Sequence, residues 1–481
     1  MATASIKHSC SSKSLSLDSG VMTITSEDSY KSDFDDNSLT PLSPSSTYTV
    51  SAIPNIEHSY IDALILCQWD NILGPRLDHV WYVTGRPQPH TNILRFVTGQ
   101  VLSGEICRDV HTSQVDIKFV DIPDKGVIIP AFIFSAQGSR GISLQSLALI
   151  IPNSELTIYL HQADLIHSWF SRIVAKLRVL CAKKDFGTSG LADLSSWLLS
   201  CLEMLSSLQT VGLPPTIQLS YTAFHPSNSI EQDFLRSVIA SHLMTFSRSV
   251  VMGLNDERVN ILVYTLGLFC WDSERFCSRA ALKGKKWPYY QDLCVQGCTK
   301  NPDGSYNLSV RDLLCSQYPT TIIDVERREV MQSSSVLDHR RLSYETLLEE
   351  LRELYEGEEG YGNSPSRFYQ PVNSPESIIK DLIEDIHKLP PDYGVREAYV
   401  RHFMHSLQRR AFCLIKYVEG EVTSGARISV KRIKQDLGLQ LEGDFRITLA
   451  VADKMKPGIY HYLLGEKKYD TEYLPNPADV L

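Results

Sequence analysis

The fold is indicated first by the stretch IDALILCQWDNILGPR, residues 61–76, in which an apolar run ends in a turn. Residues 61–69 have the length of one buried strand, and the Gly74-Pro75 pair marks the turn that ends it. A second apolar segment, residues 77–83, follows directly. We therefore expect a strand, a turn and a second strand at this place.

Downstream of these strands, the spacing of apolar residues predicts a compact α+β module. Residues 92–102 have helical spacing, and residues 115–120 alternate between two faces as a strand does. Two later segments, 126–134 and 147–151, are continuously apolar, which is typical of strands covered on both faces. Residues 161–180 carry a helical stripe of apolar side chains. Strands and long helices in this order favour a sheet packed against helices.

A second module begins near Ser229, after a looser segment (183–228) that we interpret as a linker carrying one helix. Strands then alternate with helices, which predicts an α/β module with a parallel sheet and helices on its faces. The expected helices are 230–245, 256–269, 378–389 and 395–418, and the expected strands are 248–253 and 321–325. Residues 446–455 fit a helix as well as a strand. The fold class predicted for the whole chain is therefore α/β.

Two segments are too polar to form a packed core. Residues 1–57 hold fourteen serines among the first fifty positions, and we expect a disordered arm there. Ser43-Pro44 and the acidic run 33–36 suit proline-directed and acidophilic kinases, while a neutral disordered tail is the simpler alternative. The acidic, turn-rich stretch 357–376 predicts a flexible insert.

The overall composition is typical of an intracellular protein with several domains. The 481 residues suit two or three domains, and a net charge of −9 argues against an electrostatic nucleic-acid binder. Eleven cysteines are scattered through apolar segments, which predicts reduced thiols in a cytosolic or nuclear compartment. Residues 1–17 lack the apolar core of a signal peptide, and no segment has the roughly 18 apolar residues of a membrane-spanning helix. We expect any membrane contact to be peripheral.

Motifs for nucleotide chemistry and nucleophilic catalysis are incomplete. In a phosphate-binding loop, a glycine would stand at Arg279 and a serine or threonine at Lys286. The kinase-like tripeptide Asp185-Phe186-Gly187 is accompanied by neither a glycine-rich loop nor a catalytic His-Arg-Asp loop. The Gly-x-Ser-x-Gly motif of hydrolases does not occur. We therefore expect no self-sufficient catalytic residue and no cofactor.

Metal-ligand spacing is equally incomplete. Cys294 and Cys298 are separated by three residues, and no second cysteine pair follows at the distance of a zinc finger. His402 and His405 lie one helical turn apart without a His-Glu-x-x-His motif. Structural thiols and surface histidines explain these residues better, so we expect no metal site.

Charge is unevenly distributed along the second half of the chain. Residues 340–392 contain 6 basic and 12 acidic side chains, and residues 396–468 contain 14 basic and 8 acidic ones. A basic region of this kind suits anionic lipid or an acidic partner. The alternative is a solvated surface that also contacts the acidic segment. The basic clusters are Arg409-Arg410, Lys431-Arg432, Lys434, Lys454 and Lys456.

A family resemblance is carried by the turn itself, Trp69-Asp70-Asn71-Ile72-Leu73-Gly74-Pro75-Arg76. It continues in order at LSGEI (102–106), VDIKF (115–119), KGVII (125–129), IIPNSEL (150–156), ASHL (240–243), YPTT (318–321), LIKY (414–417) and KPG (456–458). Together these landmarks resemble a family of longin-DENN proteins, the one named for a chromosome-nine open reading frame linked to amyotrophic lateral sclerosis and frontotemporal dementia. The match spans nearly everything after residue 60, and the Ser-rich arm and the acidic insert depart from it.

The resemblance implies a longin domain (58–182), a helical linker (183–228), a DENN domain (229–470) and a tail (471–481). It implies a regulatory subunit that controls Rab and Arf small GTPases together with a second longin-DENN protein and, in vertebrates, a β-propeller subunit. The implied setting is the cytoplasm, with recruitment to endosomes, autophagosomes or lysosomes, in autophagy and lysosome homeostasis. Pairing of two longin domains sheet to sheet would explain why a module with an open sheet edge needs a partner.

The site residues implied by the resemblance are those of the turn, namely Trp69, Asp70, Asn71, Gly74, Pro75 and Arg76. Arg76 is the candidate in this chain for an arginine inserted at a transferring phosphate, although in the resembling complex that arginine belongs to the partner subunit. The alternative for Arg76 is a structural role in closing the turn. Trp69, Gly74 and Pro75 are equally explained as a core anchor and as turn formers.

Two further functions stay open beside the regulatory subunit. Direct guanine-nucleotide exchange is one, because an exchange factor displaces switch loops and needs no reactive side chain. A non-enzymatic tether that positions the complex on lysosomes through the basic region is the other.

Overall fold

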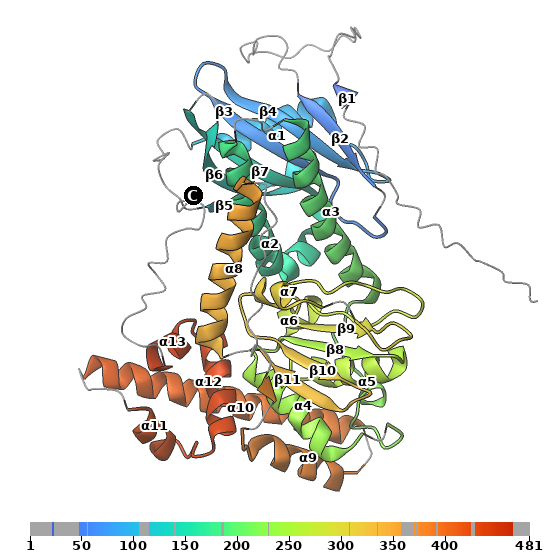
Figure 1. Cartoon of the computed structure of the whole chain (residues 1–481), viewed down its shortest axis with the longest axis vertical. Coiled ribbons are helices and arrows are strands. Elements are labelled where there is room, and N and C mark those ends of the chain that lie inside the picture. The colour runs from blue at the N-terminus through green and yellow to red at the C-terminus, as the bar shows by residue number, and fades with distance from the viewer. Residues whose placement is uncertain are drawn as a thin grey trace, which may run out of the picture.

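The computed structural model of the chain contains two α/β modules, each built around one sheet (Figure 1). In Figure 1 the first sheet lies at the top, the second lies below it, and α2, α3 and α8 run between them. The residues that the structure describes are 22–23, 48–54, 56–104, 115–138, 141–183, 187–228, 230–306, 308–333, 335–356, 370–371, 374–390, 393–424 and 429–464. The α/β class predicted from the sequence is confirmed. Most of the Ser-rich arm, residues 357–369 of the acidic insert and the tail (471–481) lie outside the described residues.

The first sheet has seven strands. Their spatial order is β1 (Met22–Thr23), β2 (Thr49–Ile53), β4 (Gly74–Val83), β3 (Ala63–Asp70), β7 (Gly141–Pro152), β6 (Val127–Gly138) and β5 (Asp116–Ile122). All neighbours are antiparallel except β2 and β4, which run parallel. The predicted strand, turn and strand at 61–83 are thus β3 and β4, which form a hairpin.

Helices cover both faces of this sheet. α1 (Thr91–Leu102) lies on one face, and α2 (Leu156–Ala182) and α3 (Thr188–Val211) lie on the other. Successive side chains of β3 point to opposite faces, so that Leu64 and Leu66 pack with α2 and α3 while Ile65 and Cys67 pack with α1. This two-sided burial is the reason for the continuous apolar runs in the sequence.

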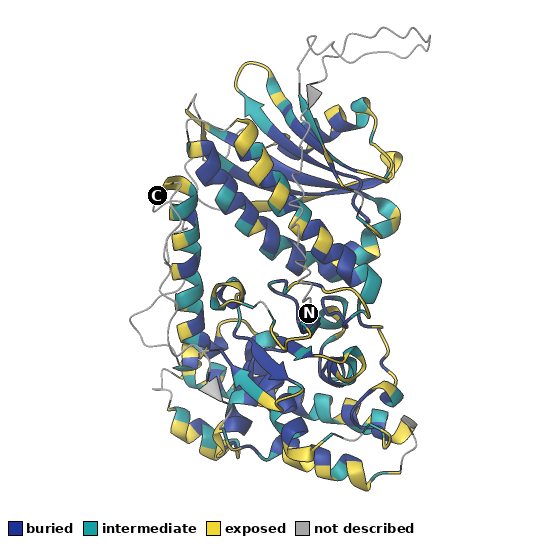
Figure 2. Ribbon diagram, turned by 45° about the vertical axis from the view of Figure 1, so that its right-hand side comes forward, coloured by how far each residue is buried: buried dark blue, intermediate teal, exposed yellow. Residues whose placement is uncertain are grey.

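Two segments beyond the expected core belong to this module. Residues Thr49–Ile53, assigned by their composition to the disordered arm, form β2 beside β4, and Ile53 is buried. The helix expected inside the linker is α3, whose apolar side packs into the same core as α2. Trp81 in β4 donates a hydrogen bond from its indole nitrogen to the hydroxyl of Ser195 in α3, at 2.8 Å. The apolar side of α3 therefore belongs to the core of the first module, and Figure 2 shows that the helices below the first sheet have buried residues on the side facing it.

The second module contains a five-stranded sheet in the order β12 (Gln370–Pro371), β11 (Glu329–Gln332), β10 (Thr321–Asp324), β8 (Ser249–Gly253) and β9 (Val295–Thr299). β8 lies parallel to both β9 and β10, as the alternation of strands and helices predicts. β11 and β12 are antiparallel additions, so the sheet is mixed rather than wholly parallel. The connection from β10 to β11 is a tight turn, with φ of +54° at Arg328, and so short a link permits only antiparallel pairing.

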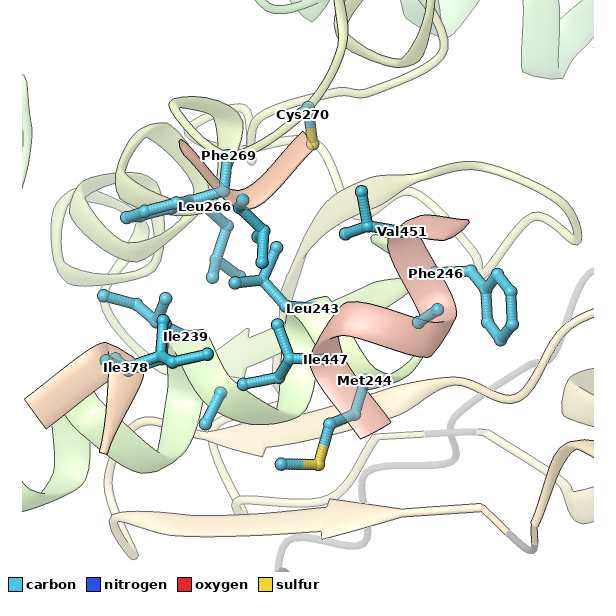
Figure 3. Close-up of a cluster of buried hydrophobic side chains, with 14 of the residues drawn as sticks. Ile239, Leu243, Met244, Phe246, Leu266, Phe269, Cys270, Ile378, Ile447 and Val451 are labelled. Atoms are coloured by element: carbon cyan, nitrogen blue, oxygen red, sulfur yellow. The ribbon is translucent and has the colours of Figure 1, made fainter. Parts of the chain in front are cut away.

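Ten helices are described in this module. They are α4 (Gln232–Met244), α5 (Asp256–Gly267), α6 (Asp272–Phe276), α7 (Val310–Leu314), α8 (Val336–Glu356), α9 (Ile378–Lys388), α10 (Tyr393–Thr423), α11 (Val430–Asp436), α12 (Glu442–Met455) and α13 (Ile459–Leu464). The ambiguous segment 446–455 is thus helical. α12 is buried on nearly all sides, and Ile447 and Val451 meet Ile239 and Leu243 of α4 in the core (Figure 3). A helix buried all round shows no clear apolar stripe, which is why its period was ambiguous.

The acidic stretch also contributes to this core. Glu376, placed by its neighbours in the flexible insert, is buried and forms an ion pair with Arg236 of α4. Its second carboxylate oxygen accepts a hydrogen bond from the backbone nitrogen of Ile379 at 2.7 Å. Glu376 therefore caps the first turn of α9, where a negative charge is favourable.

The two modules meet along α2. On this helix, the Ser168 hydroxyl donates to the Asp292 carboxylate at 2.8 Å, and the Trp169 indole donates to the carbonyl of Gln291 at 3.2 Å. Further along α2, Ala175 and Val179 pack against the buried Leu351 of α8. α2 is thus buried by the first sheet on one side and by the second module on the other.

A carboxylate that is mostly shielded from solvent ties α8 to α2. Glu350 lies 2.8 Å from the Arg172 guanidinium and 3.4 Å from the Lys176 ammonium, both on α2, and 3.6 Å from Arg311 of α7. Burial opposes ionisation of Glu350, but the charges of Arg172 and Lys176 outweigh it and lower its pKa to about 2. The junction between the modules therefore depends on one ionised carboxylate.

We expect Glu350→Gln to lower the free energy of unfolding by about 3 kcal/mol at pH 7, because it leaves buried cations without their anion. The folded-state pKa lies below the unfolded value, so this stabilisation is present above about pH 4.3 and disappears as pH falls towards 2. Urea unfolding of both proteins between pH 7 and pH 3 would measure it.

Glu349→Gln is the matched control, since Glu349 is exposed on the same helix and forms no ion pair within the described residues. It should unfold like the unsubstituted chain. Equal stability of Glu350→Gln and Glu349→Gln at pH 7 would contradict the assigned role of Glu350.

Candidate interaction surfaces

The turn residues singled out in the sequence all lie at the tip of the β3–β4 hairpin. Trp69 and Asp70 end β3, and they pair across the hairpin with Pro75 and Gly74 at the start of β4. Asn71 is in the exposed turn between them. Trp69 packs partly against the core under α1, which makes it the anchor of the hairpin end.

Local chemistry holds this turn in one conformation. One carboxylate oxygen of Asp70 accepts hydrogen bonds from the backbone nitrogens of Ile72 at 2.8 Å and Leu73 at 3.0 Å. Gly74 has φ of +80°, which a residue with a side chain adopts only with strain. The Asp-Asn…Gly pattern is therefore the signature of this particular turn.

Arg76 is engaged on its own strand. Its guanidinium lies 2.7 Å from the Asp78 carboxylate, and its Nε donates to the same carboxylate oxygen at 2.8 Å. Burial raises the pKa of Asp78, and the Arg76 charge opposes that rise. The geometry thus gives Arg76 a local electrostatic partner, beside the hairpin tip.

The residues that the tip presents are ones that the sequence analysis did not select. Ile72 is 92% exposed and Leu73 is 57% exposed, although the centre of a turn usually carries polar residues. The signal was present as two apolar residues between Asn71 and Gly74. Ile72 and Leu73 were placed in the turn, but only the other residues of the turn were singled out as site residues.

A second surface is the edge of the first sheet formed by β5. Among the described residues, β5 has a strand partner on its β6 side and none on the other. Ile117 and Phe119 are 43% and 44% exposed on this strand, and Phe119 stacks on Tyr159 of α2 at a ring distance of 5.6 Å. An edge strand with exposed apolar side chains is a template for pairing with another strand.

The basic region of the last helices is largely neutralised by its own neighbours. Glu419 accepts hydrogen bonds from Lys416 and Lys456, which lower its pKa to about 2. Further ion pairs join Arg432 to Asp436, Lys434 to Glu442 and Lys454 to Glu274. Arg409 and Arg410 on α10 have no ion pair within the part of the chain that the structure describes. The balancing charges come mainly from within the basic region rather than from the acidic segment.

The histidines and cysteines weighed as metal ligands are dispersed. His405 lines a cavity of about 570 Å³ between α10 and the start of α6, while His402 lines a separate cavity of about 350 Å³ between α9 and α10. Cys294 and Cys298 are buried free thiols, and burial raises the pKa of Cys294 to about 11. No cluster of three or more potential metal ligands occurs among the described residues. Within the same residues, no helix is both long and apolar enough to cross a membrane.

Comparison with known proteins shows which family this chain is similar to. A family model described as the C9orf72-like protein family matches residues 96–339. A human protein named guanine nucleotide exchange factor C9orf72 is 30% identical over 443 residues, which cover 85% of this chain and 92% of the human one. The mouse and rat proteins named as its homologues are each 30% identical over 465 residues, covering 89% of this chain and 96% of theirs.

We expect Arg76→Ala to lower the free energy of unfolding by about 1 kcal/mol at pH 7, because Asp78 loses its cation. Without that cation the pKa of Asp78 rises further, and the folded state then binds a proton more readily than the unfolded state. The loss should therefore shrink as pH falls from 7 towards 4. Urea unfolding at several pH values measures it.

Arg95→Ala serves as the control, since Arg95 is exposed on α1 and has no ion pair within the described residues. A pH-independent loss in Arg76→Ala, equal to that in Arg95→Ala, would show that the pair with Asp78 does not stabilise the hairpin.

Proposed function

This chain belongs to the C9orf72-like protein family, and we propose that it regulates a small GTPase of the Rab or Arf type as one subunit of a larger complex. The family resemblance carried by its turn sequence is thereby confirmed. The proposal is carried by the match to proteins named guanine nucleotide exchange factors over most of both chains. Regulators of this kind act through the surface that they offer to the GTPase.

The two modules correspond, in this proposal, to a longin domain (58–182) and a DENN domain (229–470). The mixed sheet with helices on both faces supports the first assignment, and the parallel β9-β8-β10 core with flanking helices supports the second. The packing of α3 on the first sheet favours counting 183–211 with the longin domain rather than with a linker.

The open β5 edge is the surface that we assign to a second longin-DENN subunit. Sheet-to-sheet pairing would place a strand of the partner beside β5 and cover Ile117 and Phe119. The β-propeller subunit is a further proposed partner, for which the family resemblance is the support. In this arrangement, Arg76 positions the hairpin, and an arginine for GTP hydrolysis comes from the partner subunit.

Direct nucleotide exchange by this chain is the second candidate. The names of the relatives favour it, because they describe the human, mouse and rat proteins as exchange factors or their homologues. A tether on lysosomes is a third candidate, and Arg409 and Arg410 are the cations best placed for it.

We further propose that the protein works in the cytoplasm and is recruited to endosomes, autophagosomes or lysosomes in autophagy. A fluorescent fusion that stays diffuse under starvation would argue against that recruitment.

The purified chain, tested on a panel of Rab and Arf GTPases, distinguishes the candidates. We expect the chain alone to leave GTP hydrolysis unchanged, and hydrolysis to rise at least tenfold when its longin-DENN partner is added, because the partner supplies the arginine. Release of fluorescent GDP, measured in parallel, tests exchange. Faster GDP release with the chain alone would favour direct exchange, and no effect on any GTPase in either assay would contradict the proposal.

The proposed pairing of the β5 edge with the second subunit can be tested separately. Ile117→Glu should abolish copurification with the partner subunit, because it places a charge on a strand edge that pairing would bury. The thermal midpoint should change by less than about 2 °C, since Ile117 is already half exposed. Glu substitution at Ile142, exposed to a similar degree in β7, is the control and should leave copurification intact.

A further inference from the structure

The tip of the β3–β4 hairpin exposes two large apolar side chains whose exposure the packing of the described residues does not explain. Ile72 and Leu73 stand at the centre of a turn and contribute to none of the chain's described hydrophobic clusters. Single exposed apolar residues are ordinary, but two adjacent ones at a protruding tip are not. Figure 1 shows this hairpin end at the top of the molecule, away from the second module.

The tip is also rigid. β3 lies inside the sheet and is hydrogen-bonded to β4 on one side and to β7 on the other. Trp69 anchors the end of β3 in the core. The two hydrogen bonds to Asp70 and the positive φ of Gly74 then fix the backbone of Ile72 and Leu73. A preordered apolar protrusion loses little conformational entropy on binding. A larger part of the free energy gained by burying it therefore contributes to affinity.

The charge around the tip fits a protein pocket better than an anionic bilayer. The described hairpin end 68–78 carries the carboxylates Asp70 and Asp78 and the cation Arg76, which is paired with Asp78. Membrane-binding protrusions are usually flanked by lysines and arginines that contact lipid headgroups. Ile142, at the start of β7, adds a third exposed apolar side chain at this end of the sheet.

The tip and the β5 edge do not compete for the same partner. β3 and β5 are three strand positions apart, or roughly 14 Å at the usual strand spacing. A strand added at β5 extends the sheet sideways, whereas the tip points along the strand direction. A subunit bound at β5 therefore leaves Ile72 and Leu73 free for a different protein.

We propose that Ile72 and Leu73 form a rigid wedge that docks into an apolar pocket on the small GTPase. This inference rests on the proposed function, and it assigns the GTPase contact to specific side chains. Regulation of a GTPase requires a contact that acts on loops whose conformation depends on the nucleotide. A preordered pair of apolar side chains supplies such a contact without any reactive group.

The test uses the full chain and direct binding, by biolayer interferometry, of GTPases in the nucleotide-free form, loaded with GDP and loaded with a non-hydrolysable GTP analogue. Ile72→Asp and Leu73→Asp should each weaken binding about tenfold to a hundredfold, because each removes the burial of one large apolar side chain. Ile72→Leu should keep binding within about twofold, since it preserves the apolar volume. Leu160→Asp is the matched control, because Leu160 is an exposed leucine of α2 with 60% exposure, close to the 57% of Leu73.

The outcomes separate the wedge from the function on which it rests. Binding by the unsubstituted chain, lost in Ile72→Asp and Leu73→Asp but kept in Leu160→Asp, supports the wedge. Equal binding by all four proteins overturns the wedge and leaves GTPase regulation in place. Failure of the unsubstituted chain to bind any GTPase overturns both. If the two tip variants lose sedimentation with phosphatidylserine vesicles while GTPase binding is unchanged, the tip is a membrane contact and the wedge is wrong.

Discussion

The burial of α2 between the two modules is the constraint from which the rest of the architecture follows. One side of the helix completes the core of the first sheet, and the other side meets α8 and the loop before β9. Polar contacts at Ser168 and Trp169 and the charges around Glu350 orient this second side. Because α2 packs against both modules, a rotation that improved its packing on one side would weaken its packing on the other. The relative orientation of the modules is therefore set by α2 and α8 together.

This fixed orientation distributes the exposed surfaces over different parts of the molecule. The β5 edge exposes Ile117 and Phe119 at one side of the first sheet, and the hairpin tip exposes Ile72 and Leu73 at its end. The basic residues of α10 to α12 lie in the second module, where most of them are paired with nearby carboxylates. A protein with separate surfaces of different chemistry is suited to hold several partners at once, as a regulatory subunit does.

The turn sequence shows both the strength and the limit of reading a site from residue types. Asp70 and Gly74 were selected through the family resemblance, and Gly74 was also expected to form the turn. The hydrogen bonds to Asp70 and the φ angle of Gly74 show that both residues hold this turn. Ile72 and Leu73 lie between them in the same turn, but they were not selected as site residues. Whether such a pair is buried depends on how far the hairpin extends beyond the sheet, and residue types do not encode that length.

The α/β class, the two-sided burial of the first sheet and part of the order of strands and helices follow from the amino-acid sequence alone, because runs of apolar residues record which faces meet other elements. The helix α8 and the strands β9 and β11 were not among the expected elements. Family membership also follows from it, because landmarks in order along the chain need no coordinates. The pairing of β2 with β4, the packing of α3, the helical state of α12 and the burial of Glu376 required the folded chain. Each of these features depends on a contact with residues distant in the sequence. Such a contact cannot be inferred from the local sequence, because its energy depends on both partners being in place.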